Sequence, residues 1–253
     1  LSFEAELKRR LATRPDLATS WEDIIKETLA TQPITLDSDQ QRALHAALRY
    51  PLTIISGGPG TGKTSIVRTL LACLIRGGVK PERIALAAPT GRAAQRLTDT
   101  IRSQVSDLAA TTLHHLLGYR PSRNIFTRHR DNPIDADVVI VDEASMVGLV
   151  LMSRLFQALR PNGRLVLLGD KDQLPSVDAG AVLASLTPDG KRELEASKHV
   201  VLLETNHRSE AQIRAAAQAI NHQETDLADR LAALTADRLD AQTGCSLLEQ
   251  TQA

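Results

Sequence analysis

Aromatic side chains are scarce in this chain and make up 2% of its 253 residues. Few side chains are therefore present on which nucleic acid bases could stack. The sequence holds two cysteines, Cys73 and Cys245, which lie far apart and lack the spacing of a metal site. We expect both to be reduced, inert thiols in a cytoplasmic protein. No apolar run reaches the roughly 18 residues that a membrane-spanning helix requires, and no secretory signal peptide is recognisable.

The chain also lacks net charge, because 30 Lys and Arg residues match 30 Asp and Glu residues. No overall attraction to a polyanion follows, so any contact with DNA must depend on local clusters of basic side chains. The length, with a hydrophobic content of 42%, is enough for one large domain or two small ones with a buried core.

Short apolar runs alternate with longer segments of helical periodicity from Leu36 onward. The runs are residues 52–56, 84–88, 138–141, 165–168 and 200–203. Continuous apolar strands that alternate with helices predict a parallel sheet covered by helices on both faces. We therefore expect an α/β domain over residues 35–222. Residues 1–34 are interpreted as a helical leader or the end of a preceding domain, and residues 223–253 as a helical tail.

One stretch between an expected strand and an expected helix fits the phosphate-loop pattern G-x-x-x-x-G-K-[ST]. Its residues are Gly57, Gly58, Pro59, Gly60, Thr61, Gly62, Lys63 and Thr64. Glycines let successive backbone N–H groups point at phosphate oxygens. Lys63 is expected to reach the β- and γ-phosphates of ATP, and the Thr64 hydroxyl to bind Mg²⁺. The alternative is a glycine-rich turn that matches by chance, which the strand–helix context disfavours.

Two further strand ends carry polar side chains. Asp142 and Glu143 follow the apolar run 138–141, and ligands gather at the carboxyl ends of parallel strands. Asp142 would bind Mg²⁺ through water, and Glu143 would polarise the attacking water. The alternative is an acidic pair that caps the next helix. Asp170 and Gln173 follow the run 165–168, and we expect Asp170 to belong to the nucleotide site. Gln173 could contact the γ-phosphate or the attacking water, or lie in an ordinary surface turn.

Together these motifs resemble superfamily 1 DNA helicases, and specifically the RecD family, the alpha subunit of exodeoxyribonuclease V. The resemblance covers about residues 36–222 and is carried by ISGGPGTGKT (55–64), LAAPTGRAA (86–94), TTLHHLLG (111–118), VIVDEASM (139–146) and LLGDKDQLPSVDAGAVL (167–183). It implies a RecA-like motor domain that hydrolyses ATP and moves 5′ to 3′ on single-stranded DNA. It also implies RecB- and RecC-like partner subunits, to one of which DNA cutting would belong.

The resemblance gives roles to three more residues around the nucleotide. Gln40 matches the glutamine that reads adenine, although Asp37 and Gln40 also have the spacing of a helix capping box. Arg208 matches an arginine that contacts the γ-phosphate, or is a solvated arginine at a helix start. His207 stands where the family has a tyrosine that stacks on adenine, and its imidazole is expected to stack in place of the phenol ring.

Other matching positions concern DNA. Pro89, Thr90, Thr112 and His114 resemble residues that hold the backbone of single-stranded DNA, although each threonine could equally cap a helix. Residues 119–133 lie where the family inserts a short hairpin beside the DNA, and the alternative is a solvated basic loop. Its basic side chains are Arg120, Arg123, Arg128, His129 and Arg130.

Several features depart from the family pattern. Arg92 replaces a usual lysine and His115 a usual arginine, and the stretches of a second motor domain are not recognisable, so we expect a fragment or a chain that stops early. Three alternatives stay open. The chain could be a RecD-like helicase that works without RecB and RecC, a phosphate-loop ATPase of another kind, or a non-catalytic docking module.

Overall fold

The computed structural model describes residues 3–12, 20–32, 35–102, 105, 108–173, 182–187 and 198–205. The chain divides into two compact units, Leu1–Thr205 and Asn206–Ala253. The second unit lies outside the described residues, and with it His207 and Arg208 of the predicted site. The expected boundaries at residues 34 and 222 therefore stay predictions.

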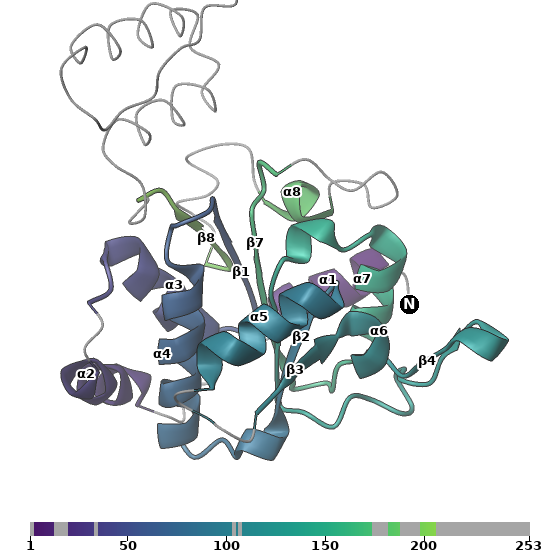
Figure 1. Cartoon of the computed structure of the whole chain (residues 1–253), viewed down its shortest axis with the longest axis horizontal. Coiled ribbons are helices and arrows are strands. Elements are labelled where there is room, and N and C mark those ends of the chain that lie inside the picture. Colours follow the sequence, from purple (N-terminus) through teal and green to yellow (C-terminus); the bar gives the residue numbers. More distant parts are fainter. Residues whose placement is uncertain are drawn as a thin grey trace, which may run out of the picture. The chain divides into compact units, whose positions relative to one another are not determined.

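A six-stranded sheet forms the centre of the first unit (Figure 1), and all of its strand pairs are parallel. Its strand order is β3-β2-β6-β7-β1-β8. The strands are β1 (Leu52–Gly57), β2 (Ile84–Ala88), β3 (Ala110–Thr112), β6 (Val138–Val141), β7 (Arg164–Gly169) and β8 (Val200–Leu203). All five apolar runs are strands, so the predicted parallel α/β fold is confirmed. The short strand β3 was not predicted, because Ala-Thr-Thr carries no apolar run.

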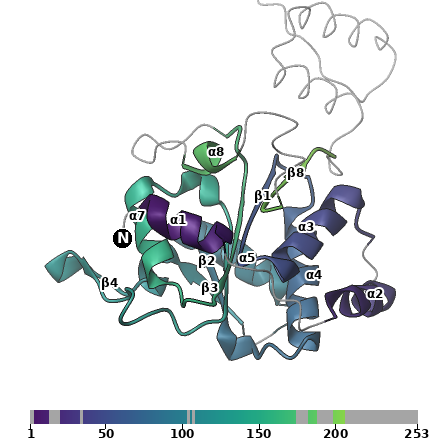
Figure 2. The same cartoon turned by 180° about the vertical axis from the view of Figure 1, so that it is seen from behind.

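Helices cover both faces of the sheet (Figures 1 and 2). One face packs against α3 (Ser38–Arg49), α4 (Lys63–Arg76) and α5 (Gly91–Ile101), and α2 (Trp21–Thr31) packs against α3 and α4. The other face packs against α1 (Phe3–Ala12), α6 (Leu113–Leu116), α7 (Leu149–Ala158) and α8 (Val182–Leu186). Strand β6 shows why both layers are needed: Val138 and Ile140 enter the first core cluster, whereas Val139 and Val141 enter the second. Within the described part of the chain, no helix combines the length and apolarity needed to cross a bilayer.

A buried arginine ties the first helix to the second layer. The Arg10 side chain on α1 is 1% exposed and donates hydrogen bonds to the carbonyl oxygens of Gly163 (2.7 Å) and Arg160 (3.0 Å). Its Nε lies 3.4 Å from a carboxylate oxygen of buried Glu6. Burial lowers the pKa of the Arg10 guanidinium to about 10, while the Glu6 carboxylate opposes this change. Helix α1 thus docks through polar contacts as well as through the ring contact of Phe3 with Phe156.

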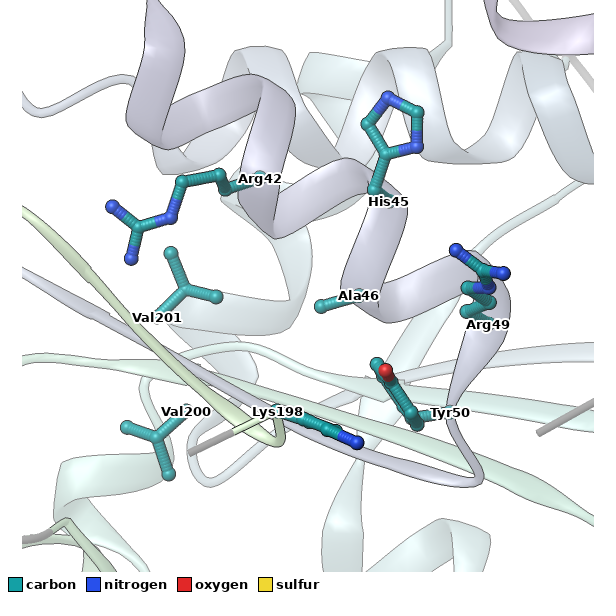
Figure 3. A pocket seen from close by; sticks show the side chains of 8 residues that line it. All are labelled: Arg42, His45, Ala46, Arg49, Tyr50, Lys198, Val200 and Val201. Atoms are coloured by element: carbon teal, nitrogen blue, oxygen red, sulfur yellow. The ribbon is translucent and has the colours of Figure 1, made fainter. Parts of the chain in front are cut away.

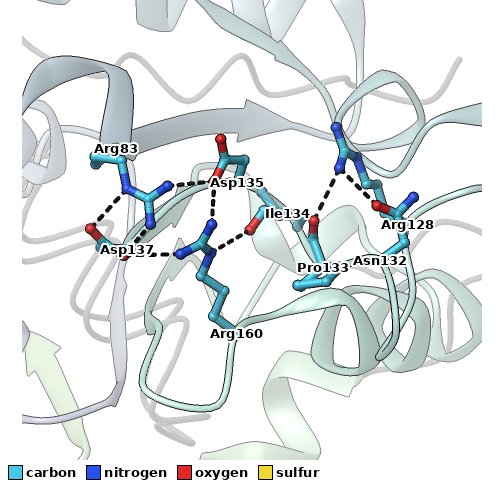
Figure 4. Close-up of polar contacts among 8 residues, drawn as sticks. All are labelled: Arg83, Arg128, Asn132, Pro133, Ile134, Asp135, Asp137 and Arg160. Carbon is cyan, nitrogen blue, oxygen red and sulfur yellow. Dashed lines mark hydrogen bonds and ion pairs between the residues drawn. The ribbon is translucent and has the colours of Figure 1, made fainter.

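An ion-pair network lies at the amino ends of β2 and β6 (Figure 4). The Arg83 guanidinium binds both carboxylate oxygens of Asp137, at 3.0 and 2.6 Å, and also contacts Asp135. Arg160, which follows α7, contacts Asp135 as well. Because Asp135 and Asp137 are exposed, each pair adds little stability by itself. The network instead joins three segments at the amino ends of the strands, and the predicted site lies at their carboxyl ends.

Candidate functional site

The phosphate loop connects β1 to α4, and its shape depends on glycine. Gly60 and Gly62 have φ angles of 82° and 83°, in the left-handed region that side chains disfavour. A Cβ on Gly57 would lie 2.6 Å from the Thr61 hydroxyl oxygen and 2.8 Å from the Leu203 Cβ. The backbone of this loop therefore excludes larger residues at these points. Thr64 lies in the first turn of α4 and is exposed, while Pro59 is exposed at the loop tip.

Lys63 lies among three carboxylates. Its Nζ donates to the carbonyl oxygens of Gly57 and, at 3.0 Å, of Gly58. Burial lowers the pKa of the Lys63 ammonium, and the negative charges of Asp170, Asp142 and Glu143 oppose that shift. These interactions mean that the loop and both predicted acidic strand ends share one site. The sheet order explains this proximity, since β7 lies between β6 and β1 and the carboxyl ends of these three parallel strands lie at the same end of the sheet.

The acidic pair occupies a tight turn after β6. Asp142 accepts a hydrogen bond from the Glu143 backbone N–H at 2.9 Å, and Glu143 has a left-handed φ of 52°. Burial raises the pKa of Asp142, which the Lys63 charge partly offsets. Burial also raises the pKa of Glu143, and the Asp142 charge raises it further. Glu143 precedes the short 3₁₀ helix η3 (Ala144–Met146) but its side chain makes no capping hydrogen bond, so the helix-cap alternative gains no support.

Gln40 holds the phosphate loop from α3. Its Nε2 donates to the Thr61 carbonyl oxygen at 3.0 Å, and its Oε1 accepts from the Asp37 backbone N–H at 3.1 Å. The Asp37 carboxylate in turn accepts from the Gln40 backbone N–H at 2.8 Å, which completes the predicted capping box. The role of Gln40 toward adenine stays a prediction.

The turn after β7 is fastened to both neighbouring strand ends. The Asp170 carboxylate accepts from the Asp172 backbone N–H at 3.0 Å, and the Lys171 N–H donates to the Ser56 hydroxyl at 2.9 Å. The Ser145 hydroxyl donates to the Gln173 Oε1 at 3.0 Å. Sequence reasoning missed both serines. Their only signal was position, since Ser56 ends an apolar strand directly before the loop and Ser145 lies three residues after Asp142.

The four predicted DNA contacts follow β2 and β3, at the same carboxyl-terminal end of the sheet as the phosphate loop. Pro89 and Thr90 follow β2, whose Ala88 pairs with Thr112 of β3, and His114 lies two residues further on. The Thr90 hydroxyl accepts from the Ala93 N–H and begins α5, and the Thr112 hydroxyl accepts from the His115 N–H and begins α6, both at 3.2 Å. Both threonines are thus helix caps. Their contact with DNA stays a prediction.

A small hairpin lies within residues 119–133. Its strands β4 (Tyr119–Arg120) and β5 (Ile125–Phe126) are antiparallel and are connected by η2 (Pro121–Arg123). The ring centroids of Tyr119 and Phe126 lie 4.9 Å apart, and those of His114 and Tyr119 lie 5.3 Å apart. Two of its arginines are bound to other groups of the protein. Arg128 donates to the Pro133 carbonyl oxygen at 3.1 Å, and Arg130 pairs with Glu6 on α1 at 3.5 Å.

A separate basic hollow of about 360 Å³ lies between α3 and β8 (Figure 3). It is lined by Arg42, His45, Ala46, Arg49, Tyr50, Lys198, Val200 and Val201. None of the predicted site residues lines it, so this hollow is not the nucleotide site.

Comparison with known proteins identifies the family. Residues 40–179, more than half of the chain, match the family described as "AAA domain". The RecBCD enzyme subunit RecD of Mycolicibacterium smegmatis is 47% identical over 206 residues, 75% of this chain and 36% of that protein. The RecD subunit of Haemophilus influenzae is 43% identical over 58% of this chain and 26% of its own length. The ATP-dependent RecD2 DNA helicase of Deinococcus radiodurans is 39% identical over 60% of this chain and 20% of its own length.

The chain spans about a third or less of the length of these relatives. Among solved structures, Bacteroides Pif1 in complex with ADP-AlF4 superposes with a TM-score of 0.52 and 22% identity, over 79% of this chain and 50% of that one. At that identity the likeness concerns the fold, and it confirms the RecA-like arrangement. With the AAA-domain match and the RecD relatives, these findings show that the chain belongs to the RecD family of superfamily 1 helicases.

Proposed function

We propose that this chain is the ATP-hydrolysing motor domain of a DNA helicase, in which hydrolysis drives 5′ to 3′ movement along single-stranded DNA. The observation that carries the proposal is the position of Lys63, whose ammonium interacts with Asp142, Glu143 and Asp170 beside the glycine loop. A cation and backbone amides at the end of β1, with carboxylates at the ends of the next two strands, β7 and β6, suit a magnesium–triphosphate complex.

The donor set fits Mg²⁺, which usually takes one or two protein ligands together with phosphate oxygens and water. The Thr64 hydroxyl and the Asp142 carboxylate would hold the ion. When bound, the ion would neutralise charge that develops on the phosphates. Lys63 would bind the β- and γ-phosphates through its ammonium; burial lowers the pKa of this group, and the charges of the three carboxylates oppose that change.

Glu143 is proposed as the residue that orients and deprotonates the attacking water. Its raised pKa makes the carboxylate a stronger base than an exposed glutamate. Gln173 would donate a hydrogen bond to the γ-phosphate, and Gln40 would contact adenine. Stacking by His207 and a γ-phosphate contact by Arg208 belong to the same proposal and concern residues outside the described part of the chain.

Single-stranded DNA would bind along Pro89, Thr90, Thr112 and His114, beside the hairpin of β4 and β5. Hydroxyl and backbone donors suit phosphate contacts that do not read sequence. We propose RecB- and RecC-like subunits as partners and the cytoplasm as the location, since relatives at 43–47% identity carry the name RecBCD enzyme subunit RecD. The match to a RecD2 DNA helicase favours a second candidate, a helicase that works without those subunits.

The test is nucleotide binding and steady-state ATP hydrolysis with and without a single-stranded oligonucleotide. Lys63→Ala should abolish detectable turnover, because it removes the cation at the transferring phosphate. Lys80→Ala is the matched control, since Lys80 is an exposed lysine outside the site, and it should leave both measurements unchanged. We expect residues 1–253 alone to bind nucleotide and hydrolyse it slowly, because the resemblance implies a second motor domain that completes the site. Full activity of Lys63→Ala would exclude the proposal.

A further inference from the structure

The turn that carries the two carboxylates also carries a buried hydroxyl. Ser145, in η3, is 8% exposed, and its Oγ donates a hydrogen bond to the Gln173 Oε1 at 3.0 Å. The partners are 28 residues apart in the chain and follow different strands, β6 and β7. This bond therefore connects the acidic turn directly to the turn that carries the proposed γ-phosphate contact.

The direction of this bond determines what the glutamine can do. A glutamine amide has one acceptor atom, Oε1, and one donor group, Nε2–H₂. With the Ser145 hydroxyl on Oε1, the amide is oriented so that its other end is a donor. Phosphate oxygens are acceptors and require a donor. The opposite amide orientation would present a carbonyl oxygen to a phosphate, which is repulsive.

Both ends of the bond rest on backbone that is held in place. A Cβ on Gly169, the last residue of β7, would lie 3.0 Å from the Ser145 backbone nitrogen and 3.4 Å from that of Ala144. The end of β7 is thus packed directly on the acidic turn. On the glutamine side, the Lys171 N–H is bonded to the Ser56 hydroxyl at 2.9 Å. A hydrogen bond between two such supported turns can preserve a side-chain orientation.

We propose that Ser145 is a positioning residue for recognition of the third phosphate: it holds the Gln173 amide with its N–H donors toward the γ-phosphate. Ser145 acts through Gln173 and need not touch the nucleotide itself. The inference rests on the proposed function, because it concerns the same ATP site. It predicts that loss of the hydroxyl weakens binding of a three-phosphate state and spares binding of ADP.

The experiment compares the affinities of the protein for Mg·ADP and for Mg·ADP with aluminium fluoride, which occupies the third phosphate position. Ser145→Ala should weaken aluminium fluoride–dependent binding by about 3- to 10-fold, the effect of one hydrogen bond. Affinity for ADP alone should stay within about twofold of the unmodified protein. Ser145→Thr, which restores a hydroxyl, should recover most of the difference. Ser153→Ala is the matched control, because Ser153 lies on α7 and its hydroxyl accepts a hydrogen bond from the Gln157 side-chain amide at 3.4 Å.

A double variant separates positioning from general damage. If Ser145 acts through Gln173, then Ser145→Ala combined with Gln173→Ala should be no weaker in aluminium fluoride–dependent binding than Gln173→Ala alone. Equal weakening of both nucleotide states by Ser145→Ala, an additive double variant, or no change at all would overturn the inference. Loss of ADP binding in Ser145→Ala with a lowered unfolding temperature would also overturn it. Failure of the proposed function has a different signature, namely ATP hydrolysis that Lys63→Ala leaves unchanged.

Discussion

The side-chain amide of Gln40 donates a hydrogen bond to the carbonyl oxygen of Thr61, which lies 21 residues away in the phosphate loop. The same amide closes the capping box at the start of α3 through Asp37. The first turn of α3 therefore supports the loop from outside, and the loop conformation is coupled to the start of this helix.

Replacing this glutamine separates two roles. Gln40→Ala should lower the free energy of unfolding by about 1–2 kcal/mol, because it removes a buried hydrogen bond and half of the capping box. If Gln40 only supports the loop, affinities for ATP and GTP should fall by the same factor. If it also reads adenine, ATP binding should fall more. Gln41→Ala is the control, since Gln41 donates to the Leu36 carbonyl oxygen at 2.9 Å and does not reach the loop. Unchanged stability and unchanged affinities in Gln40→Ala would contradict both roles.

Arg10→Ala should destabilise the domain by about 2–3 kcal/mol. The change leaves the carbonyl oxygens of Gly163 and Arg160 without this donor and removes one cation beside the buried Glu6 carboxylate. Chemical denaturation followed by circular dichroism measures the loss. Arg9→Ala is the comparison, because Arg9 pairs with the same carboxylate from a half-exposed position and should cost less than about 1 kcal/mol. Equal losses in the two variants would contradict a docking role for Arg10.

Glu143→Gln should lower the rate of ATP hydrolysis by about 100-fold or more. The same change should stabilise the fold at neutral pH. The folded-state pKa of Glu143 is raised, first by burial and then by the Asp142 charge, so the ionised carboxylate is less favourable in the folded chain than in the unfolded chain. This penalty is complete above the folded-state pKa. It disappears as the pH falls below the unfolded-state pKa, because both states are then protonated.

The measurement for this variant is the unfolding temperature as a function of pH. The advantage of Glu143→Gln over the unmodified protein should be greatest at neutral pH and should shrink toward acidic pH. Glu82→Gln, at an exposed glutamate in η1 (Pro81–Arg83), should show no such trend. An advantage that grows toward acidic pH would have the wrong sign and would contradict the burial of Glu143.

Local sequence patterns predicted which segments lie together around the phosphate loop. The glycine spacing of the loop, the carboxylates after the run 138–141 and the polar turn after the run 165–168 are short-range features, and parallel strands bring their carboxyl ends to one edge. The capping box of Asp37 and Gln40 was also readable, because its partners are three residues apart.

The sequence by itself determined five of the six strands of the central sheet, the glycine loop and the polar side chains at the strand ends beside it, because hydrophobic periodicity and backbone requirements act over a few residues. Only the tertiary structure decided which distant partners meet: Gln40 with Thr61, Ser145 with Gln173, and Arg10 with Gly163. Serine, glutamine and arginine have many acceptable partners, and nothing in their local sequence specifies which one packing will bring within 3 Å. The meeting of Ser145 with Gln173 follows from the strand order, which places β7 beside β6, and from the close approach at Gly169, and both exist only once the sheet has formed.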